Sequence, residues 1–222
     1  GAGTDTLVFQ YDQKGNVLDL VNQANNAGMF RGSTFTNIER FVVGDDFATG
    51  FGELTFKGDD TAQDLEVRIG ILSVDLGGGD DTLRLAVAST NGNANVAEGG
   101  AGIDRLVFNA AATGNLLDLQ SQTGNLPFLG WKFTGFEIFE LKTDGSAPAA
   151  SSWLDRNGDA TASTVIGGAG ADFFRGRGGA DVLLGGAGGD TYIFAPGDGN
   201  DTITDIGFNE TDTLQLVGIV QT

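Results

Sequence analysis

IGGAGADFFRGRGGADVLLGGAGGDTYIFAPGDGNDTIT occupies residues 166–204 and decides the fold of this chain. Read in nines from Gly167, it gives three consecutive copies of one phrase, and a fourth follows the insertion Phe194-Ala195. Each copy has a glycine-rich half, one aspartate and a short apolar half. The aspartates are Asp172, Asp181, Asp190 and Asp201, and the large apolar residues two positions later are Phe174, Leu183, Tyr192 and Ile203. A flexible glycine-rich linker would not keep this register through four copies.

The residue types in each copy predict a turn followed by a strand. Glycine tolerates positive φ and close backbone approach, so the first half can form a tight turn with converging carbonyl oxygens. The aspartate adds a carboxylate, and a group of hard oxygen ligands suits calcium. The β-branched and aromatic residues that follow predict a short strand whose large residue points into a core.

Two copies make one solenoid turn with a strand on each side, so every second aspartate should lie on the same edge. We therefore expect Asp172 and Asp190, eighteen residues apart, on one edge, and Asp181 and Asp201 on the opposite edge. Stacked carboxylates repel one another unless a cation lies between them.

The phrase matches the nonapeptide G-G-x-G-x-D-x-U-x, a calcium-binding repeat of parallel β-helices. The chain therefore resembles the RTX family of secreted calcium-binding proteins. The resemblance implies an all-β fold, a parallel β-roll or β-solenoid with several calcium ions in the glycine/aspartate turns. It also implies export by type I secretion and an extracellular or cell-surface location. Together with alternation along the turns, it indicates carbonyl ligands at Gly167, Ala169, Gly176, Gly178, Gly185 and Ala187.

The front of the chain is internally duplicated. Three blocks recur in one order at nearly constant spacing: residues 1–9 at 100–108, 16–20 at 115–119, and 35–41 at 133–139. Such a long-period repeat is typical of solenoids and arrays. We expect residues 1–99 to form a first β-solenoid unit and residues 100–165 a second, homologous one. Residues 166–222 are expected to form the four-copy calcium-binding roll, continuous with the second unit.

Degenerate copies of the calcium phrase lie outside the four-copy run. Two open the duplicated units, one closes the first unit, and one lies near the end of the chain. They add four candidate calcium ligands: Asp5, Asp104, Asp81 and Asp212. The copy at residue 1 lacks its first position, so we expect the chain to be a piece of a longer polypeptide.

Two further acidic features have competing interpretations. Asp155, Asn157 and Asp159 place oxygen-bearing side chains at alternate positions, as a calcium loop does. The later glutamate of an EF-hand is missing, so these residues are either additional calcium ligands or a solvated turn. Glu39 and Glu137 occupy matching positions in the duplicated units. We interpret them as hydrogen-bonding groups at strand ends, not as catalytic acids.

Composition excludes several classes of function. The net charge is −18, from 12 basic and 30 acidic residues, which argues against a nucleic-acid partner and against an anionic membrane surface. Glycine and aspartate interrupt every apolar run, so we expect no membrane insertion. The chain has no cysteine and no histidine, which removes disulfides, the usual general base and the commonest zinc ligand.

These features favour a structural calcium-binding module that folds on binding calcium after export, as a spacer or lattice element of an adhesin, surface-layer protein or toxin. One alternative is a non-catalytic module that binds a glycan or a protein. Another is the C-terminal part of a secreted enzyme whose catalytic domain lies elsewhere. We expect no catalytic residue in this chain. Besides calcium, the candidate partners are a second copy of the chain and a surface glycan or protein.

Overall fold

The computed structural model describes residues 3–9, 15–44, 54–68, 73–85, 95–109, 115–118, 123–124, 131–142, 152–155, 162–205 and 210–218. The described elements are short β-strands and two 3₁₀ helices. No described helix is long and apolar enough to cross a membrane. The chain forms two compact units, Gly1–Val107 with Leu129–Phe136, and Phe108–Phe128 with Glu137–Thr222. The three segments predicted from the sequence stay a prediction.

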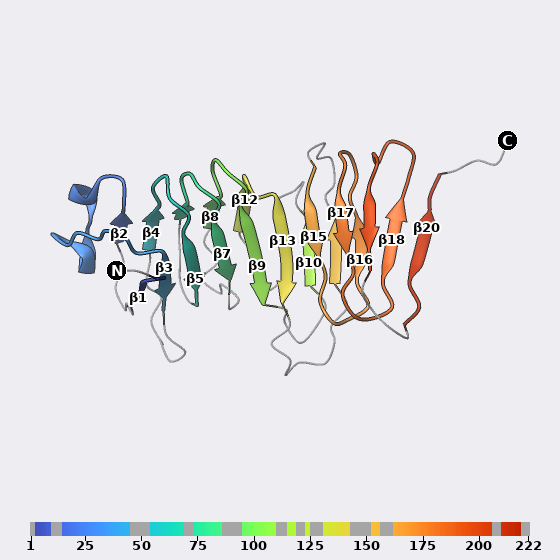
Figure 1. Ribbon diagram of the computed structural model, residues 1–222, viewed down its shortest axis with the longest axis horizontal. Coiled ribbons are helices and arrows are strands. Elements are labelled where there is room, and N and C mark those ends of the chain that lie inside the picture. Colours follow the sequence, from blue (N-terminus) through green and yellow to red (C-terminus); the bar gives the residue numbers. More distant parts are fainter. Residues whose placement is uncertain are drawn as a thin grey trace. The chain divides into compact units, whose positions relative to one another are not determined.

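In the first unit, successive strands alternate between two sheets, and neighbours within each sheet are parallel. The arrows of β2 and β4 point opposite to those of β3 and β5 (Figure 1). One sheet has the order β1 (Thr6–Phe9), β3 (Arg40–Val43), β5 (Asp64–Val67), β7 (Thr82–Leu85), and β9 (Arg105–Asn109) begins beside β7. The other contains β2 (Asn16–Asp19), β4 (Leu54–Lys57), β6 (Ser73–Asp75), β8 (Asn95–Glu98) and β12 (Trp131–Thr134).

One long excursion interrupts the regular winding of this unit. Residues 20–39 connect β2 to β3 and contain both helices, η1 (Gln23–Asn25) and η2 (Gly28–Phe30). Phe30 is buried and packs edge-on against Phe9, with ring centroids 4.8 Å apart. Ala27 forms an antiparallel bridge to Val17. The excursion therefore lies against β2.

The second unit winds in the same way. One sheet contains β13 (Ile138–Lys142), β15 (Thr164–Ile166), β17 (Val182–Leu184) and β19 (Thr202–Thr204) in parallel order. The other has the order β11 (Thr123–Gly124), β10 (Asn115–Asp118), β14 (Ser152–Asp155), β16 (Phe173–Arg175), β18 (Thr191–Phe194) and β20 (Thr213–Leu216), parallel except for the β10–β11 pair. These long parallel sheets confirm the predicted all-β solenoid.

The middle residue of each short strand fills the core between the sheets, because alternate strand residues face opposite sides. Phe174, Leu183 and Tyr192 are buried, as predicted, and the rings of Phe174 and Tyr192 stack with centroids 5.3 Å apart. The prediction was wrong for Ile203, which is 40% exposed. Ile203 lies on β19, the last strand of its sheet, where no further described strand covers it.

Candidate metal centre

On one edge of the second unit, three aspartates form a ladder. Asp172, Asp190 and Asp212 each occupy the position before a strand, at β16, β18 and β20. The backbone N–H of Asp172 donates to Oδ1 of Asp190 at 2.8 Å, and the N–H of Asp190 donates to Oδ1 of Asp212 at 3.1 Å. The backbone carbonyls of Asp172 and Asp190 accept hydrogen bonds from the next coil, since Thr191 N–H donates to Asp172 O and Thr213 N–H donates to Asp190 O. One oxygen of Asp190 and one of Asp212 are thereby held in position.

The opposite edge repeats this pattern. Ser163 N–H donates to Oδ1 of Asp181 at 2.8 Å, and Asp181 N–H donates to Oδ1 of Asp201 at 3.1 Å. Val182 N–H continues the column by donating to Ser163 O at 2.7 Å. The structure thus places Asp181 and Asp201 on one edge and Asp172 and Asp190 on the other, each set in one column.

The first unit carries the same ladder, with different side chains at some steps. Gln63 N–H donates to Oδ1 of Asp81 at 2.7 Å, and Asp81 N–H donates to Oδ1 of Asp104 at 2.9 Å. Asp5 enters through its backbone N–H, which donates to Oε2 of Glu39 at 2.8 Å. Glu39 is therefore a strand-end hydrogen-bonding group, as interpreted from the sequence. Sequence reasoning missed Gln63, whose only signal is its place before β5.

The second carboxylate oxygen of several ladder residues has no partner. Within the described residues, Oδ2 of Asp81, Asp190 and Asp201 is buried and makes no hydrogen bond. Burying a charged oxygen without a partner is costly, so these atoms call for a cation or a donor.

Glycines leave room in front of these oxygens. A Cβ atom at Gly176 would lie 2.6 Å from Oδ2 of Asp181 and 2.9 Å from Oδ2 of Asp201. A Cβ atom at Gly185 would overlap Oδ2 of Asp190 and lie 2.7 Å from Oδ2 of Asp205. Each glycine thus opens a small space lined by carboxylate oxygens, where a side chain could not fit.

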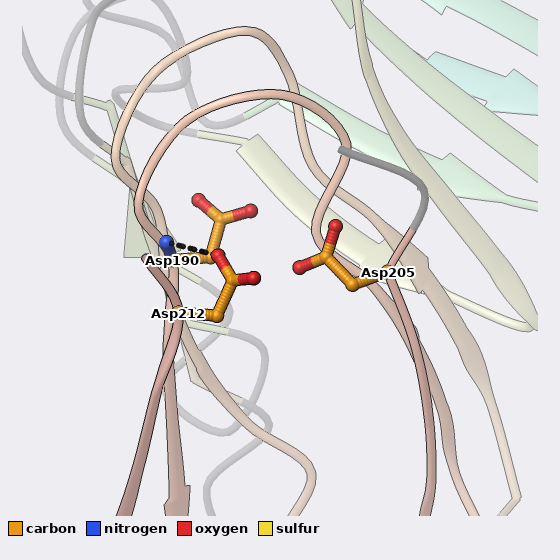
Figure 2. Close-up of side chains that lie close together, drawn as sticks. All are labelled: Asp190, Asp205 and Asp212. Atoms are coloured by element: carbon orange, nitrogen blue, oxygen red, sulfur yellow. Dashed lines mark hydrogen bonds between the residues drawn. The ribbon is translucent and has the colours of Figure 1, made fainter. Parts of the chain in front are cut away.

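The clearest cluster consists of Asp190, Asp205 and Asp212, whose ligand oxygens all lie within 4.8 Å of one another. Figure 2 shows the carboxylate of Asp205 facing those of Asp190 and Asp212 across a common space. Tyr192 Oη donates to Oδ2 of Asp205 at 2.8 Å, and burial together with this bond raises the pKa of Tyr192, which keeps its proton. Asp205 was absent from the predicted ligands. It follows β19 directly, where earlier copies have glycine.

The electrostatics of the ladders favour a bound cation. Burial raises the pKa of Asp190 to about 6, and the charges of Asp172, Asp205 and Asp212 contribute. Burial likewise raises the pKa of Asp81 to about 7, with Asp104 among the nearby charges. The pKa of Asp201 is raised by burial and by Asp198. A raised carboxyl pKa means that the protein disfavours the charged form, which a cation would relieve.

Residues 157–192 match the family model of the RTX calcium-binding nonapeptide repeat (4 copies). These residues are RTX repeats. They include Asp172, Asp181 and Asp190, and the repeat is a calcium-binding element, not a catalytic one. No curated protein and no solved structure matches the chain.

The backbone of the RTX repeats offers further oxygens. Carbonyls of some turn residues are engaged, since Ala187 N–H donates to Gly168 O and Asn200 N–H to Gly179 O. Within the described residues, no backbone hydrogen bond reaches the six carbonyls predicted as ligands, at Gly167, Ala169, Gly176, Gly178, Gly185 and Ala187. The donor set of carboxylate and carbonyl oxygens fits a hard cation such as calcium.

One predicted group lies largely outside the described residues. Asp155 ends β14, but its side chain is not among the described parts, and neither Asn157 nor Asp159 is described. Their assignment as ligands stays a prediction.

Proposed function

We propose that this chain is a structural calcium-binding module of a secreted or cell-surface protein, which folds on binding calcium after export by type I secretion. The observation that carries the proposal is the set of buried carboxylate oxygens, at Asp81, Asp190 and Asp201, that make no hydrogen bond within the described residues. Its natural roles are those of a spacer or lattice element in an adhesin, surface-layer protein or toxin.

The aspartates have two tasks in this proposal. Oδ1 of Asp190 accepts the N–H of Asp172 and so ties two coils together, while Oδ2 is left to hold a cation with nearby turn carbonyls. Asp201 does the same on the opposite edge, where its Oδ1 accepts the N–H of Asp181, and Asp81 does the same in the first unit, where its Oδ1 accepts the N–H of Gln63. Calcium, when bound, supplies positive charge that offsets these carboxylates. Because only the folded turns assemble the ligands, binding stabilises the folded chain by mass action.

The same residues account for an unfolded chain before export. At low calcium, the ladder carboxylates repel one another and the glycine-rich turns keep high conformational entropy. Extracellular modules bind calcium with dissociation constants of roughly 10⁻⁴ to 10⁻³ M, so millimolar calcium outside the cell would fill the sites.

Limited trypsin digestion at micromolar and at millimolar calcium tests this proposal. Arg175 and Arg177 lie within the RTX repeats and supply cleavage sites. We expect rapid cleavage there at micromolar calcium and protection at millimolar calcium. A permanently unfolded substrate, digested in parallel, controls for effects of calcium on trypsin. Equal cleavage rates at the two concentrations would contradict the proposal.

A further inference from the structure

The first unit contains a cavity of about 570 Å³. It forms where the excursion 20–39 faces the short turn between β4 and β5, so its walls come from Gln23 and Phe35 on one side and from Asp59 and Thr61 on the other. Small-molecule sites commonly measure about 300 to 1,000 Å³. Binding sites are also concentrated on loops that a rigid scaffold holds in place.

The excursion is held by specific contacts. The Gln23 side chain pairs with both backbone groups of Phe35, donating from Nε2 to the carbonyl at 2.6 Å and accepting the N–H at Oε1 at 2.5 Å. The buried Asp19 carboxylate accepts the N–H of Asn22 at 2.7 Å and the amide of Asn25 at 2.8 Å. The cavity wall is therefore organised before any ligand arrives, which lowers the entropic cost of binding.

Two carboxylates on the wall are held in place by hydrogen bonds to one oxygen, and the other oxygen can still accept a hydrogen bond. Asp59 Oδ1 accepts the N–H of Thr61 at 2.9 Å, its hydroxyl at 2.6 Å, and Nε2 of Gln63 at 2.7 Å. Glu39 uses Oε2 for the N–H of Asp5. Within the described residues, Oδ2 of Asp59 and Oε1 of Glu39 accept no hydrogen bond, while the Thr61 hydroxyl is already donating. The wall therefore has a surplus of charged acceptors.

The rest of the lining is mixed. The apolar side chains of Leu20, Phe35 and Ile38 lie beside the fully buried Phe41, and polar residues such as Gln23 and Asn37 complete the wall. None of the lining residues is basic, so an anionic ligand would meet two carboxylates and no counter-charge. A bare metal ion would make no use of the apolar side chains in the wall. We propose that this cavity binds an organic cation, an alkylammonium or guanidinium group on an apolar stem, with Glu39 and Asp59 on the charge and Phe35 against the stem. This binding role is additional to the calcium module.

Calorimetric titration of the full chain, held in saturating calcium, tests the proposal. The probes are butylguanidine and the capped tripeptide acetyl-Gly-Arg-Gly-amide. The same tripeptide with citrulline, an uncharged isostere of arginine, is the control ligand. We expect the charged probes to bind and the citrulline peptide to bind at least about tenfold more weakly, since a charge-assisted hydrogen bond is worth more than a neutral one. If the tripeptide binds more tightly than butylguanidine, the cation belongs to a peptide. If the two probes bind equally well, the cation belongs to a small molecule.

Glu39→Gln and Asp59→Asn each remove a charge but keep an oxygen for the existing backbone bond. Each should weaken binding of butylguanidine by about tenfold. Asp60→Asn is the matched control, because Asp60 is exposed, adjacent and outside the lining. Circular dichroism establishes that the variants fold. Equal affinity for the citrulline peptide, or equal effects of all three variants, would overturn the proposal. Displacement of butylguanidine when calcium is raised about tenfold above the concentration that saturates the turns would make the cavity a metal site and overturn the proposal as well.

Discussion

Replacing Asp190 by asparagine should stabilise the fold without calcium, and this gain should be lost when calcium is bound. Asp190 is fully buried, its Oδ1 accepts the N–H of Asp172, and its Oδ2 has no hydrogen-bond partner within the described residues. Asparagine has nearly the same shape and keeps the Oδ1 acceptor. Asp190→Asn therefore removes the charge and little else.

The magnitude follows from the pKa of Asp190, which burial raises from 3.8 to about 6 in the folded chain. A shift of about two units corresponds to about 3 kcal/mol. Because the folded pKa is raised, the favourable contribution is complete below about pH 4 and is lost as the pH rises through about 6. At neutral pH without calcium, the charged Asp190 thus costs about 3 kcal/mol, and asparagine removes this cost. With calcium at about a hundred times the dissociation constant, losing one site costs about 2.7 kcal/mol, which nearly cancels the gain of about 3 kcal/mol, so variant and parent should then be about equally stable.

Two folding measurements by circular dichroism separate these effects. In EGTA, folding is driven by trimethylamine N-oxide, which favours compact states; Asp190→Asn should fold at a lower concentration than the parent chain. In millimolar calcium, the variant should unfold at about the same urea concentration as the parent. Asp60→Asn, at an exposed position, should change neither midpoint appreciably. An equal gain of stability in both conditions would refute the assignment of Asp190 as a cation ligand.

Three further predictions follow from the same geometry. In EGTA with trimethylamine N-oxide, the fold should gain stability as the pH falls from about 7.5 to 5, because the raised pKa values of Asp81 and Asp190 make the folded chain take up protons. In calcium, the same acidification should weaken calcium binding, which calorimetry measures, because protons compete with calcium for the carboxylates. Gly185→Ala should lower calcium affinity, since its Cβ overlaps Oδ2 of Asp190, whereas Gly78→Ala, whose Cβ meets nothing closer than 3.3 Å, should not. Phe174→Ala should cost about 3 to 5 kcal/mol in urea unfolding with calcium, because its ring is fully buried, and a cost below about 1 kcal/mol would contradict its core position.

Much of the second unit could be predicted because its sequence is periodic. Identical spacing of Asp172, Asp181 and Asp190 places alternate residues on opposite edges, and the strand period turns Phe174 and Leu183 inward. Ile203 has the same local sequence signal, but burial also depends on a covering coil, which the described structure does not provide beyond β19. The repeat therefore predicts which way a side chain points, but not whether a neighbouring coil covers it.

Other parts of the site depend on contacts between residues that share no pattern. Gln63 and Glu39 occupy ladder positions without an aspartate or a glycine-rich turn to mark them. Asp205 joins Asp190 because the degenerate last turn brings its carboxylate to a glycine position. The cavity likewise depends on the pairing of Gln23 with Phe35, twelve residues away, which no repeat predicts.

We expect calcium to build this fold. The most direct measurement is a calcium titration of the full chain followed by far-ultraviolet circular dichroism, with magnesium as the control ion. Magnesium prefers small octahedral sites and dehydrates reluctantly, so it should not replace calcium in these turns. We expect little β-structure in EGTA, a cooperative rise with calcium below or near millimolar, and no comparable rise with magnesium. A β-sheet signal that is already complete in EGTA would contradict the claim.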